Sequence, residues 1–194
     1  MGRDMDCSHE PLASALTPAD AIAYSCNSFV TSFARNMKNE ALAAALASYG
    51  LGEVTGLAAG EAQSEITVPA SVEQRQLMAI GESNILVTPL ALAAAYRRLA
   101  RRIHEPRMQP VLDGMQRSVT VGTSQLARSA KVSVAGKTGT ALSVDASRRH
   151  AWFAGFAPAD HPKVVVVVFV PQGAGAWDAA PIARKVVDAW ALTQ

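Results

Sequence analysis

The amino-acid sequence predicts an α+β fold, in which an antiparallel sheet is flanked by helices and preceded by a mainly helical part. Helical patterns fill much of the chain up to about residue 121. Three strand-like segments follow in a row, at 132–140, 151–157 and 164–170, and an amphipathic helix follows at 179–192. Because consecutive strands with short connections pair as neighbours, this order favours an antiparallel sheet covered by helices.

Four of the helices predicted before the sheet begin near a residue that suits a helix start. Thr, Ser and Asn side chains accept hydrogen bonds from the first N–H groups of a helix, and proline fits its first turn. Thr17-Pro18 therefore predicts a helix over 18–24, and Thr88-Pro89 predicts one that closes at Arg101 and Arg102. The remaining helices are expected after Ser25-Cys26-Asn27, at 40–48 after Asn39, at 71–80 from Ser71, and at 112–121.

Apolar spacing assigns one face to each of three helices. These faces are Phe29, Phe33 and Met37 in the second helix, Leu92, Tyr96, Leu99 and Ile103 in the helix from Pro89, and Ile182, Val186, Ala189 and Trp190 in the last helix. The segment 50–60 holds four glycines and is expected to form loops and turns.

Length and composition favour a single domain over 1–194, with a mainly helical part at 6–110 and a sheet part at 111–194. The chain has 194 residues and 49% apolar content, enough to fill one core. A formal net charge of +2 argues against nucleic acid as a partner. The longest apolar run, at 164–170, is too short to span a bilayer, and residues 1–11 lack the apolar core of an export signal.

The segment that carries most chemistry is Gly136-Lys-Thr-Gly-Thr140, at the end of the first predicted strand. Gly136 and Gly139 leave the strand backbone open to something lying alongside. Between these glycines, Lys137 offers an ammonium group and Thr138 a hydroxyl. Such an edge suits a peptide with a terminal carboxylate, although an isolated Lys-Thr-Gly is usually an ordinary exposed turn. A phosphate-binding loop is excluded, because position 131 is lysine where that motif needs glycine.

Ser25-Cys26-Asn27 is a second candidate, because a bend between two helices can turn a serine and an asparagine toward one cleft. Taken alone it is weak, since both residues are common in caps and turns. The chain contains neither Gly-x-Ser-x-Gly nor Ser-x-x-Lys, so it offers no recognisable serine nucleophile. Cys26 has no neighbouring cation that would activate its thiol.

The sequence predicts no metal site and no cofactor. Its four histidines are scattered singly, and its two cysteines, Cys7 and Cys26, have no metal-like spacing. That spacing leaves both a disulfide and two free thiols open, and free thiols are the prediction.

Five sequence pieces, in this order and spacing, resemble the transpeptidase domain of penicillin-binding proteins, which cross-link bacterial cell walls. They are Ser-Cys-Asn within 24–29, Leu-Gly and Thr-Gly-Leu within 50–60, Thr-Pro-Leu-Ala at 88–91, Ala-Gly-Lys-Thr-Gly-Thr-Ala at 135–141, and Ala-Trp-Phe-Ala-Gly-Phe-Ala-Pro at 151–158. Ser-x-Asn and Lys-Thr-Gly are two of the three signatures of serine acyltransferases that recognise penicillin. The resemblance implies the penicillin-binding transpeptidase or serine β-lactamase-like fold.

The resemblance also implies roles for six residues in transfer of an acyl group from stem peptides ending in D-Ala-D-Ala. Ser25 would relay a proton toward the leaving nitrogen, and Lys137 would keep that hydroxyl polarised. Asn27 would bind the substrate amide, and Thr138 would bind the terminal carboxylate. Gly139 belongs to the same binding strand, and the N–H of Thr140 would supply half of an oxyanion hole.

The chain departs from the family pattern because Ser-x-x-Lys, expected upstream of Ser25, does not occur in it. We therefore expect the C-terminal part of a transpeptidase domain, inactive alone, with the missing N-terminal segment as a partner beside stem peptides and β-lactams. The parent would act on the periplasmic face of the bacterial inner membrane. The alternatives are a non-catalytic penicillin- or peptide-binding module, half of a split enzyme, and a β-lactamase-like hydrolase.

Overall fold

The computed structural model describes residues 5–7, 9–10 and 15–194, and its architecture is the predicted α+β fold. Its elements in chain order are α1 (Pro18–Tyr24), α2 (Asn27–Ala34), α3 (Asn39–Ser48), β1 (Glu65–Ile66), α4 (Val72–Ala79), β2 (Ile85–Leu86), α5 (Pro89–Arg102), η1 (Pro106–Met108), α6 (Gln109–Thr120), η2 (Gln125–Ala127), β3 (Ala135–Leu142), β4 (Arg149–Ala157), β5 (Val164–Val170), η3 (Gly175–Ala179) and α7 (Ala180–Ala191).

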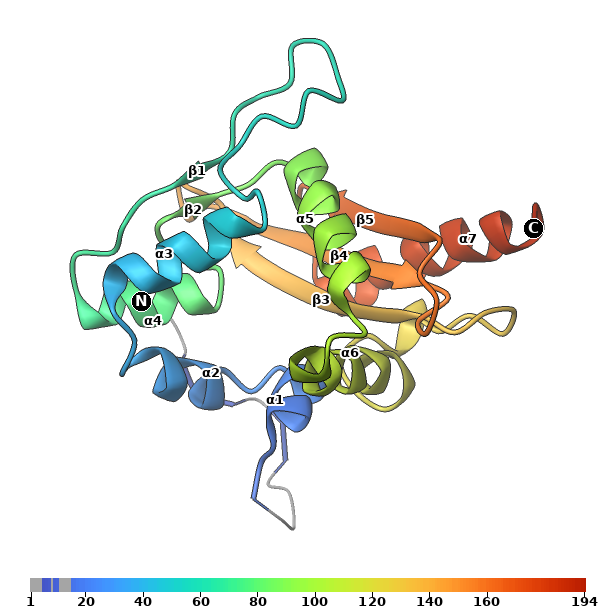
Figure 1. The fold of residues 1–194 in the computed structure, drawn as a ribbon, viewed down its shortest axis with the longest axis horizontal. Helices are drawn as coiled ribbons and strands as arrows, with labels where there is room; N and C mark the ends of the chain where they lie inside the picture. Colours follow the sequence, from blue (N-terminus) through green and yellow to red (C-terminus); the bar gives the residue numbers. More distant parts are fainter. Residues whose placement is uncertain (1–4, 8, 11–14) are drawn as a thin grey trace.

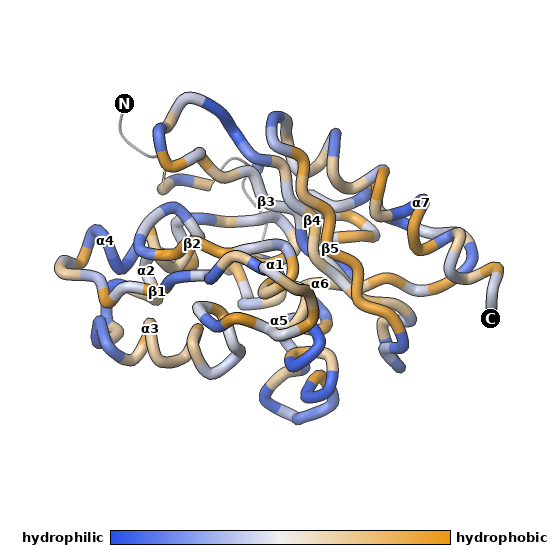
Figure 2. The backbone as a smooth tube through the Cα atoms, turned by 90° about the horizontal axis from the view of Figure 1, so that it is seen from above, coloured by the Kyte–Doolittle hydropathy of each residue, from blue (hydrophilic) through white to orange (hydrophobic). Residues whose placement is uncertain are grey.

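The sheet of β3, β4 and β5 lies between α7 on one side and α5 and α6 on the other (Figure 1, Figure 2). The helices α1 to α4 are grouped beside the sheet, together with the unpredicted two-residue strands β1 and β2. Among the described residues, no helix is long and apolar enough to cross a membrane.

The predicted helix caps are present at α1, α4 and α5. Thr17, Ser71 and Thr88 each accept a hydrogen bond from the backbone N–H three residues further on, at 3.1–3.2 Å. These bonds satisfy donors that a helix start otherwise leaves free. The helix expected at 112–121 is also confirmed, as α6, although it begins three residues earlier.

The helix α2 is shorter than its apolar spacing predicts. It ends at Ala34, so Met37 lies beyond it, and Phe33 is 71% exposed. The buried Arg75 side chain of α4 donates to the Ala34 carbonyl oxygen at 2.8 Å and to the Arg35 carbonyl oxygen at 2.7 Å. A residue far along the sequence therefore supplies the hydrogen bonds to the last carbonyls of α2. The local apolar spacing cannot predict this helix end.

The three strands of the large sheet are consecutive and antiparallel, as predicted. The strand β5 has the expected bounds, whereas β3 begins at Ala135 and ends at Leu142. A Cβ atom at Gly136 would collide with the Phe153 ring. The absent side chain of Gly136 therefore makes room for a core residue, and the prediction that this glycine opens the strand to a ligand is wrong.

The apolar face predicted for the last helix is wrong at Ile182, Val186 and Ala189, which are exposed, whereas Trp190 packs against the core as predicted. Ile182 and Val186 are 42% and 46% exposed, whereas Ala183 and Val187 are buried against β4 and β5. The π-helical turn η3, which the sequence pattern does not reveal, immediately precedes α7. Small residues at the contact let α7 lie close to the sheet, so side-chain size rather than apolar periodicity decides which face is buried.

Cys7 and Cys26 form a disulfide, so the free thiols expected from their spacing are a wrong prediction. The segment at 5–7 returns to the start of α2, where the Ser28 hydroxyl donates to the Met5 carbonyl oxygen at 3.3 Å. This return path brings the two cysteines together across 19 positions, and spacing alone does not specify it.

Asp20 links α1 to α6 and is expected to stabilise the fold. Its carboxylate accepts hydrogen bonds from Thr17 and, at 2.6 Å, from Arg117, and these bonds lower its pKa to about 2. Asp20→Asn should lower the free energy of unfolding at pH 7 by about 1–2 kcal/mol, measured by urea denaturation. Because the folded-state pKa is depressed, this advantage should hold above about pH 4 and shrink as the pH falls toward 2.

The matched control for Asp20→Asn is Glu53→Gln, which removes the ion pair between exposed Glu53 and Arg98. An exposed pair contributes little, so this change should cost less than about 0.5 kcal/mol. Equal losses in the two variants would contradict the role assigned to Asp20.

Candidate active site

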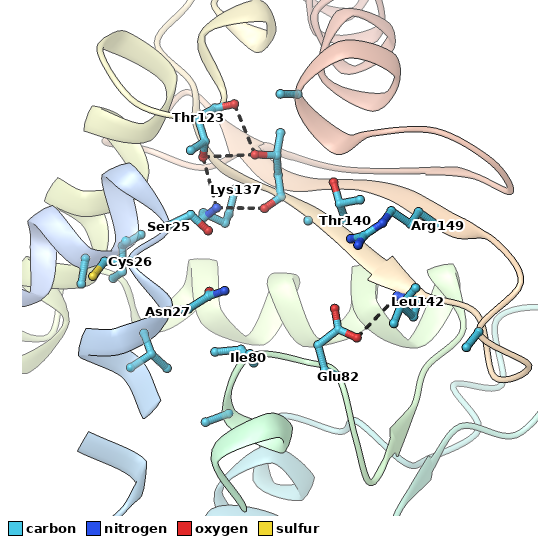
Figure 3. Close-up of a pocket in the computed structure, with 18 residues that line it drawn as sticks. Ser25, Cys26, Asn27, Ile80, Glu82, Thr123, Lys137, Thr140, Leu142 and Arg149 are labelled. Carbon is cyan, nitrogen blue, oxygen red and sulfur yellow. Dashed lines mark hydrogen bonds between the residues drawn. The ribbon is translucent and has the colours of Figure 1, made fainter. Parts of the chain in front are cut away.

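A groove of about 950 Å³ separates the bend between α1 and α2 from the edge of β3 (Figure 3). The six residues given roles from the sequence all line this one groove: Ser25, Asn27, Lys137, Thr138, Gly139 and Thr140. The first two come from the helical part and the other four from β3. The fold therefore brings two sequence motifs together that are far apart in the chain.

The bend that carries Ser25 is held in an unusual backbone conformation. Ser25 ends α1 with φ = 57° and ψ = 47°, a left-handed conformation that costs free energy for a residue other than glycine. Its N–H donates to the last carbonyls of α1, and Cys26 donates to the Ala21 carbonyl oxygen at 2.9 Å. The bend is thereby fixed, with Ser25 on the groove wall beside Lys137 (Figure 3).

The outer edge of β3 offers the backbone N–H of Thr140 to the groove. In an antiparallel pair, alternate N–H groups point away from the partner strand. Of these, the Thr138 N–H donates to the Ser124 hydroxyl at 3.0 Å, and the Leu142 N–H donates to the Glu82 carboxylate at 3.5 Å. The Thr140 N–H lies between them by the same alternation, and within the described part of the chain it has no assigned acceptor.

Lys137 is partly buried, and its ammonium group lies inside the groove wall. It donates to the Thr123 hydroxyl at 3.2 Å and to the Thr138 carbonyl oxygen at 2.9 Å (Figure 3). Burial lowers the pKa of Lys137 to about 8. Among described residues no hydrogen bond joins Lys137 to Ser25, so the predicted contact between these two side chains stays a prediction.

The penicillin binding protein transpeptidase domain family matches this chain over residues 3–188. The chain belongs to that family. A groove with Ser-x-Asn on one wall and Lys-Thr-Gly on the other fits the match, and the resemblance inferred from the sequence is confirmed.

Relatives of this transpeptidase domain include peptidoglycan D,D-transpeptidases from bacteria. MrdA of Acinetobacter baumannii is 36% identical over 87 residues, and PbpA of Mycolicibacterium smegmatis is 37% identical over 98 residues. These alignments cover 38% and 46% of this chain, but only 13% and 20% of those proteins. The chain thus corresponds to a small part of the curated relatives it matches.

Solved structures of the family are similar over nearly the whole chain. Pseudomonas aeruginosa PBP2, in complex with WCK 5153, aligns with a TM-score of 0.81 and 25% identity, over 97% of this chain and 55% of that one. The transpeptidase domain of Legionella pneumophila FtsI4 aligns with a TM-score of 0.73 and 28% identity, over 91% of this chain and 69% of that one.

Sequence reasoning missed three groove residues. Thr123 bridges Lys137 and Thr138, and the charged side chains of Glu82 and Arg149 lie at the far end of the groove (Figure 3). In the sequence, the neighbouring Gly122 is the one feature that points to Thr123. A Cβ atom at position 122 would collide with the Ala23 carbonyl oxygen, so the close contact there needs glycine. A single glycine after a helix usually marks only a helix end, so that signal is ambiguous.

One cluster of metal-binding residue types lies behind the bend. The potential ligand atoms of Cys7, His9 and Cys26 lie within 4.8 Å of one another, a proximity that the sequence spacing does not reveal. The His9 Nε2 atom is buried and has no hydrogen-bond partner among the described residues. In the disulfide form the two sulfur atoms are not thiolates, and thiolates are the sulfur ligands that metals bind.

The lowered pKa of Lys137 gives a testable pH dependence. The NMR signals of its ε-methylene group should titrate near pH 8 and be absent in Lys137→Met. An unfolded lysine has a pKa of about 10.4, so between pH 8 and 10.4 the unfolded chain binds more protons. The free energy of unfolding should therefore rise with pH across this window in the wild type, and this rise should be lost in Lys137→Met. A titration midpoint near 10.4 would contradict the burial argument.

Proposed function

We propose that this chain forms the peptide-binding and charge-stabilising part of a peptidoglycan D,D-transpeptidase site, acting on stem peptides that end in D-Ala-D-Ala. The observation that carries the proposal is the Thr140 N–H, which by strand alternation points from the outer edge of β3 into the groove that the Ser25 bend also lines. An acyl-transfer site needs this combination of a carboxylate anchor, an amide donor and a proton relay.

The terminal carboxylate of the peptide binds at the Thr138 hydroxyl. Thr138 and Thr123 both line the groove, and their hydroxyl oxygens lie 3.2 Å apart. The Lys137 ammonium donates to Thr123 and adds positive charge at the same end. An anion placed here is favoured by that charge, and hydrogen bonds to a carboxylate are stronger than those between neutral groups.

The backbone of the bound peptide lies along the outer edge of β3. The Thr140 N–H donates to the oxygen of the penultimate carbonyl and stabilises the negative charge that develops on it during attack. Gly139 adds no side chain that would hold the peptide away from the strand, and a Cβ atom there would have its nearest neighbour at 3.6 Å. Asn27, on the opposite wall, hydrogen-bonds to the peptide amide.

Ser25 transfers a proton to the leaving group. When the carbon–nitrogen bond breaks, the leaving D-Ala nitrogen needs a proton, and the Ser25 hydroxyl is placed on the wall beside Lys137 to relay one. A lysine with a pKa of about 8 is readily interconverted between its charged and neutral forms near neutral pH. It can therefore both polarise the Ser25 hydroxyl and exchange a proton with it.

The attacking serine is the part that this sequence does not hold, because Ser-x-x-Lys does not occur in it. We propose that the chain acts with a segment carrying that motif, on the outer face of the bacterial inner membrane, where β-lactams would occupy the same groove. The absence of the motif also favours a second candidate, a non-catalytic module that binds peptide or penicillin in this groove.

Peptide binding tests the proposal directly. Thr138→Val should weaken binding of diacetyl-L-lysyl-D-alanyl-D-alanine by about tenfold, because one hydrogen bond to a charged group is lost. The affinity is measured by NMR titration, with Thr120→Val as control, since Thr120 is exposed on α6 and lies outside the groove. Absence of binding to the wild-type chain would overturn the proposal.

An acylation assay tests the claim that this chain lacks the nucleophile. The purified chain should show no covalent labelling by a fluorescent penicillin, because an acyl-enzyme needs an attacking atom. Labelling is measured by gel fluorescence and intact-protein mass spectrometry, with a complete relative as the positive control. Stoichiometric acylation of any serine, or of Cys26, would refute the claim that the nucleophile is absent.

A further inference from the structure

A chain of buried hydroxyl groups lies directly behind Thr138. The hydroxyl oxygens of Ser118 and Ser124 lie 2.8 Å apart, and Ser124 donates to the Thr138 hydroxyl at 3.3 Å. Ser118, near the end of α6, and Ser124, just before η2, are both 0% exposed. Neither lines the groove, so neither can touch a ligand.

The donation from Ser124 to the Thr138 hydroxyl oxygen sets the direction of the other hydrogen bonds along this chain. Ser124 has one hydroxyl hydrogen and two lone pairs. Its oxygen accepts from the Thr138 N–H at 3.0 Å, and its hydrogen goes to the Thr138 hydroxyl oxygen. The bond between Ser118 and Ser124 must then run from Ser118 to Ser124, which leaves Ser124 with every donor and acceptor position used.

This direction determines where the hydroxyl hydrogen of Thr138 points. Because Ser124 donates to the Thr138 oxygen, the hydrogen of the Thr138 hydroxyl is directed away from Ser124. In the free protein it reaches the carbonyl oxygen or the hydroxyl oxygen of Thr123, at 3.3 and 3.2 Å. Both distances exceed the usual 2.7–2.8 Å of such bonds, so they are weak and easily exchanged for a carboxylate.

We propose that Ser124 is a positioning residue, which makes Thr138 a hydrogen-bond donor toward the groove and so selects ligands with a terminal carboxylate over neutral ones. A carboxylate has only acceptor atoms, so it gains from a hydroxyl held as a donor, and hydroxyl donation into the Thr138 oxygen strengthens that donor. The inference rests on the proposed function, since it assumes that the carboxylate binds at Thr138.

The test compares two ligands across four forms of the protein. The ligands are diacetyl-L-lysyl-D-alanyl-D-alanine and its C-terminal amide, and the dissociation constants are measured by NMR titration. In Ser124→Ala the preference for the acid over the amide should fall by about tenfold, which corresponds to about 1.4 kcal/mol. Ser124→Thr keeps the hydroxyl and should restore the preference.

The matched control is Ser118→Ala, which removes another buried hydroxyl of the same chain. Without Ser118, the Ser124 hydrogen still has the Thr138 oxygen as its acceptor, so the preference for the acid should stay close to that of the wild type. A purely structural role for Ser124 would weaken both ligands equally in Ser124→Ala. An unchanged ratio of the two affinities in that variant would overturn the inference.

The experiment also separates failure of the proposed function from failure of the inference about Ser124. If Ser124→Ala does not fold, Ser124→Cys supplies the same comparison, because a thiol fills the space but is a weak donor. If the wild-type chain binds neither ligand, the proposed function fails, and the inference fails with it. If it binds both ligands and Ser124→Cys keeps the full preference for the acid, only the inference fails.

Discussion

The two walls of the groove are joined through Thr123, in the turn after α6, which bonds both to the carbonyl at the end of α1 and to β3. The Thr123 N–H donates to the Ala23 carbonyl oxygen at 3.1 Å, and Gly122 has no side chain, which permits the contact. The side chain of Thr123 bonds to Lys137 and Thr138 on β3. Thr123 therefore fixes α1, which carries Ser25, relative to β3, and no other groove residue is tied to both walls in this way among the described residues.

The sequence predicted those parts of the fold that depend on local chemistry. The caps at Thr17, Ser71 and Thr88 are local, because each hydroxyl reaches an N–H three residues away, and the strand β5 is a continuous apolar run. The early end of α2 depends instead on Arg75, which lies far along the chain. The buried face of α7 depends on its packing against β4 and β5. Apolar periodicity cannot report such long-range contacts.

The residues of the candidate site also divide into those that the sequence predicts and those that only the fold reveals. Ser25 and Lys137 stand out in the sequence because their short motifs resemble a family pattern, and the fold places both on one groove. Thr123, Ser118 and Ser124 belong to no motif, since a lone threonine or serine near the end of a helix is commonplace. Their importance comes from three-dimensional proximity, just as the disulfide of Cys7 and Cys26 does. Hydroxyl groups acquire a role only through their neighbours, so composition and spacing could not have identified them.

The polarity of the groove follows from groups that can only donate. An ammonium and a backbone N–H have no acceptor atoms, so Lys137 must donate to the Thr123 oxygen, and Thr138 must donate its N–H to Ser124. Each bond uses a lone pair on a hydroxyl oxygen and leaves the hydrogen of that hydroxyl to point elsewhere. The hydrogens left over are those of Thr123 and Ser124, and the Ser124 hydrogen is donated to the Thr138 hydroxyl oxygen. Backbone geometry and one buried cation thus give neutral hydroxyls a defined direction.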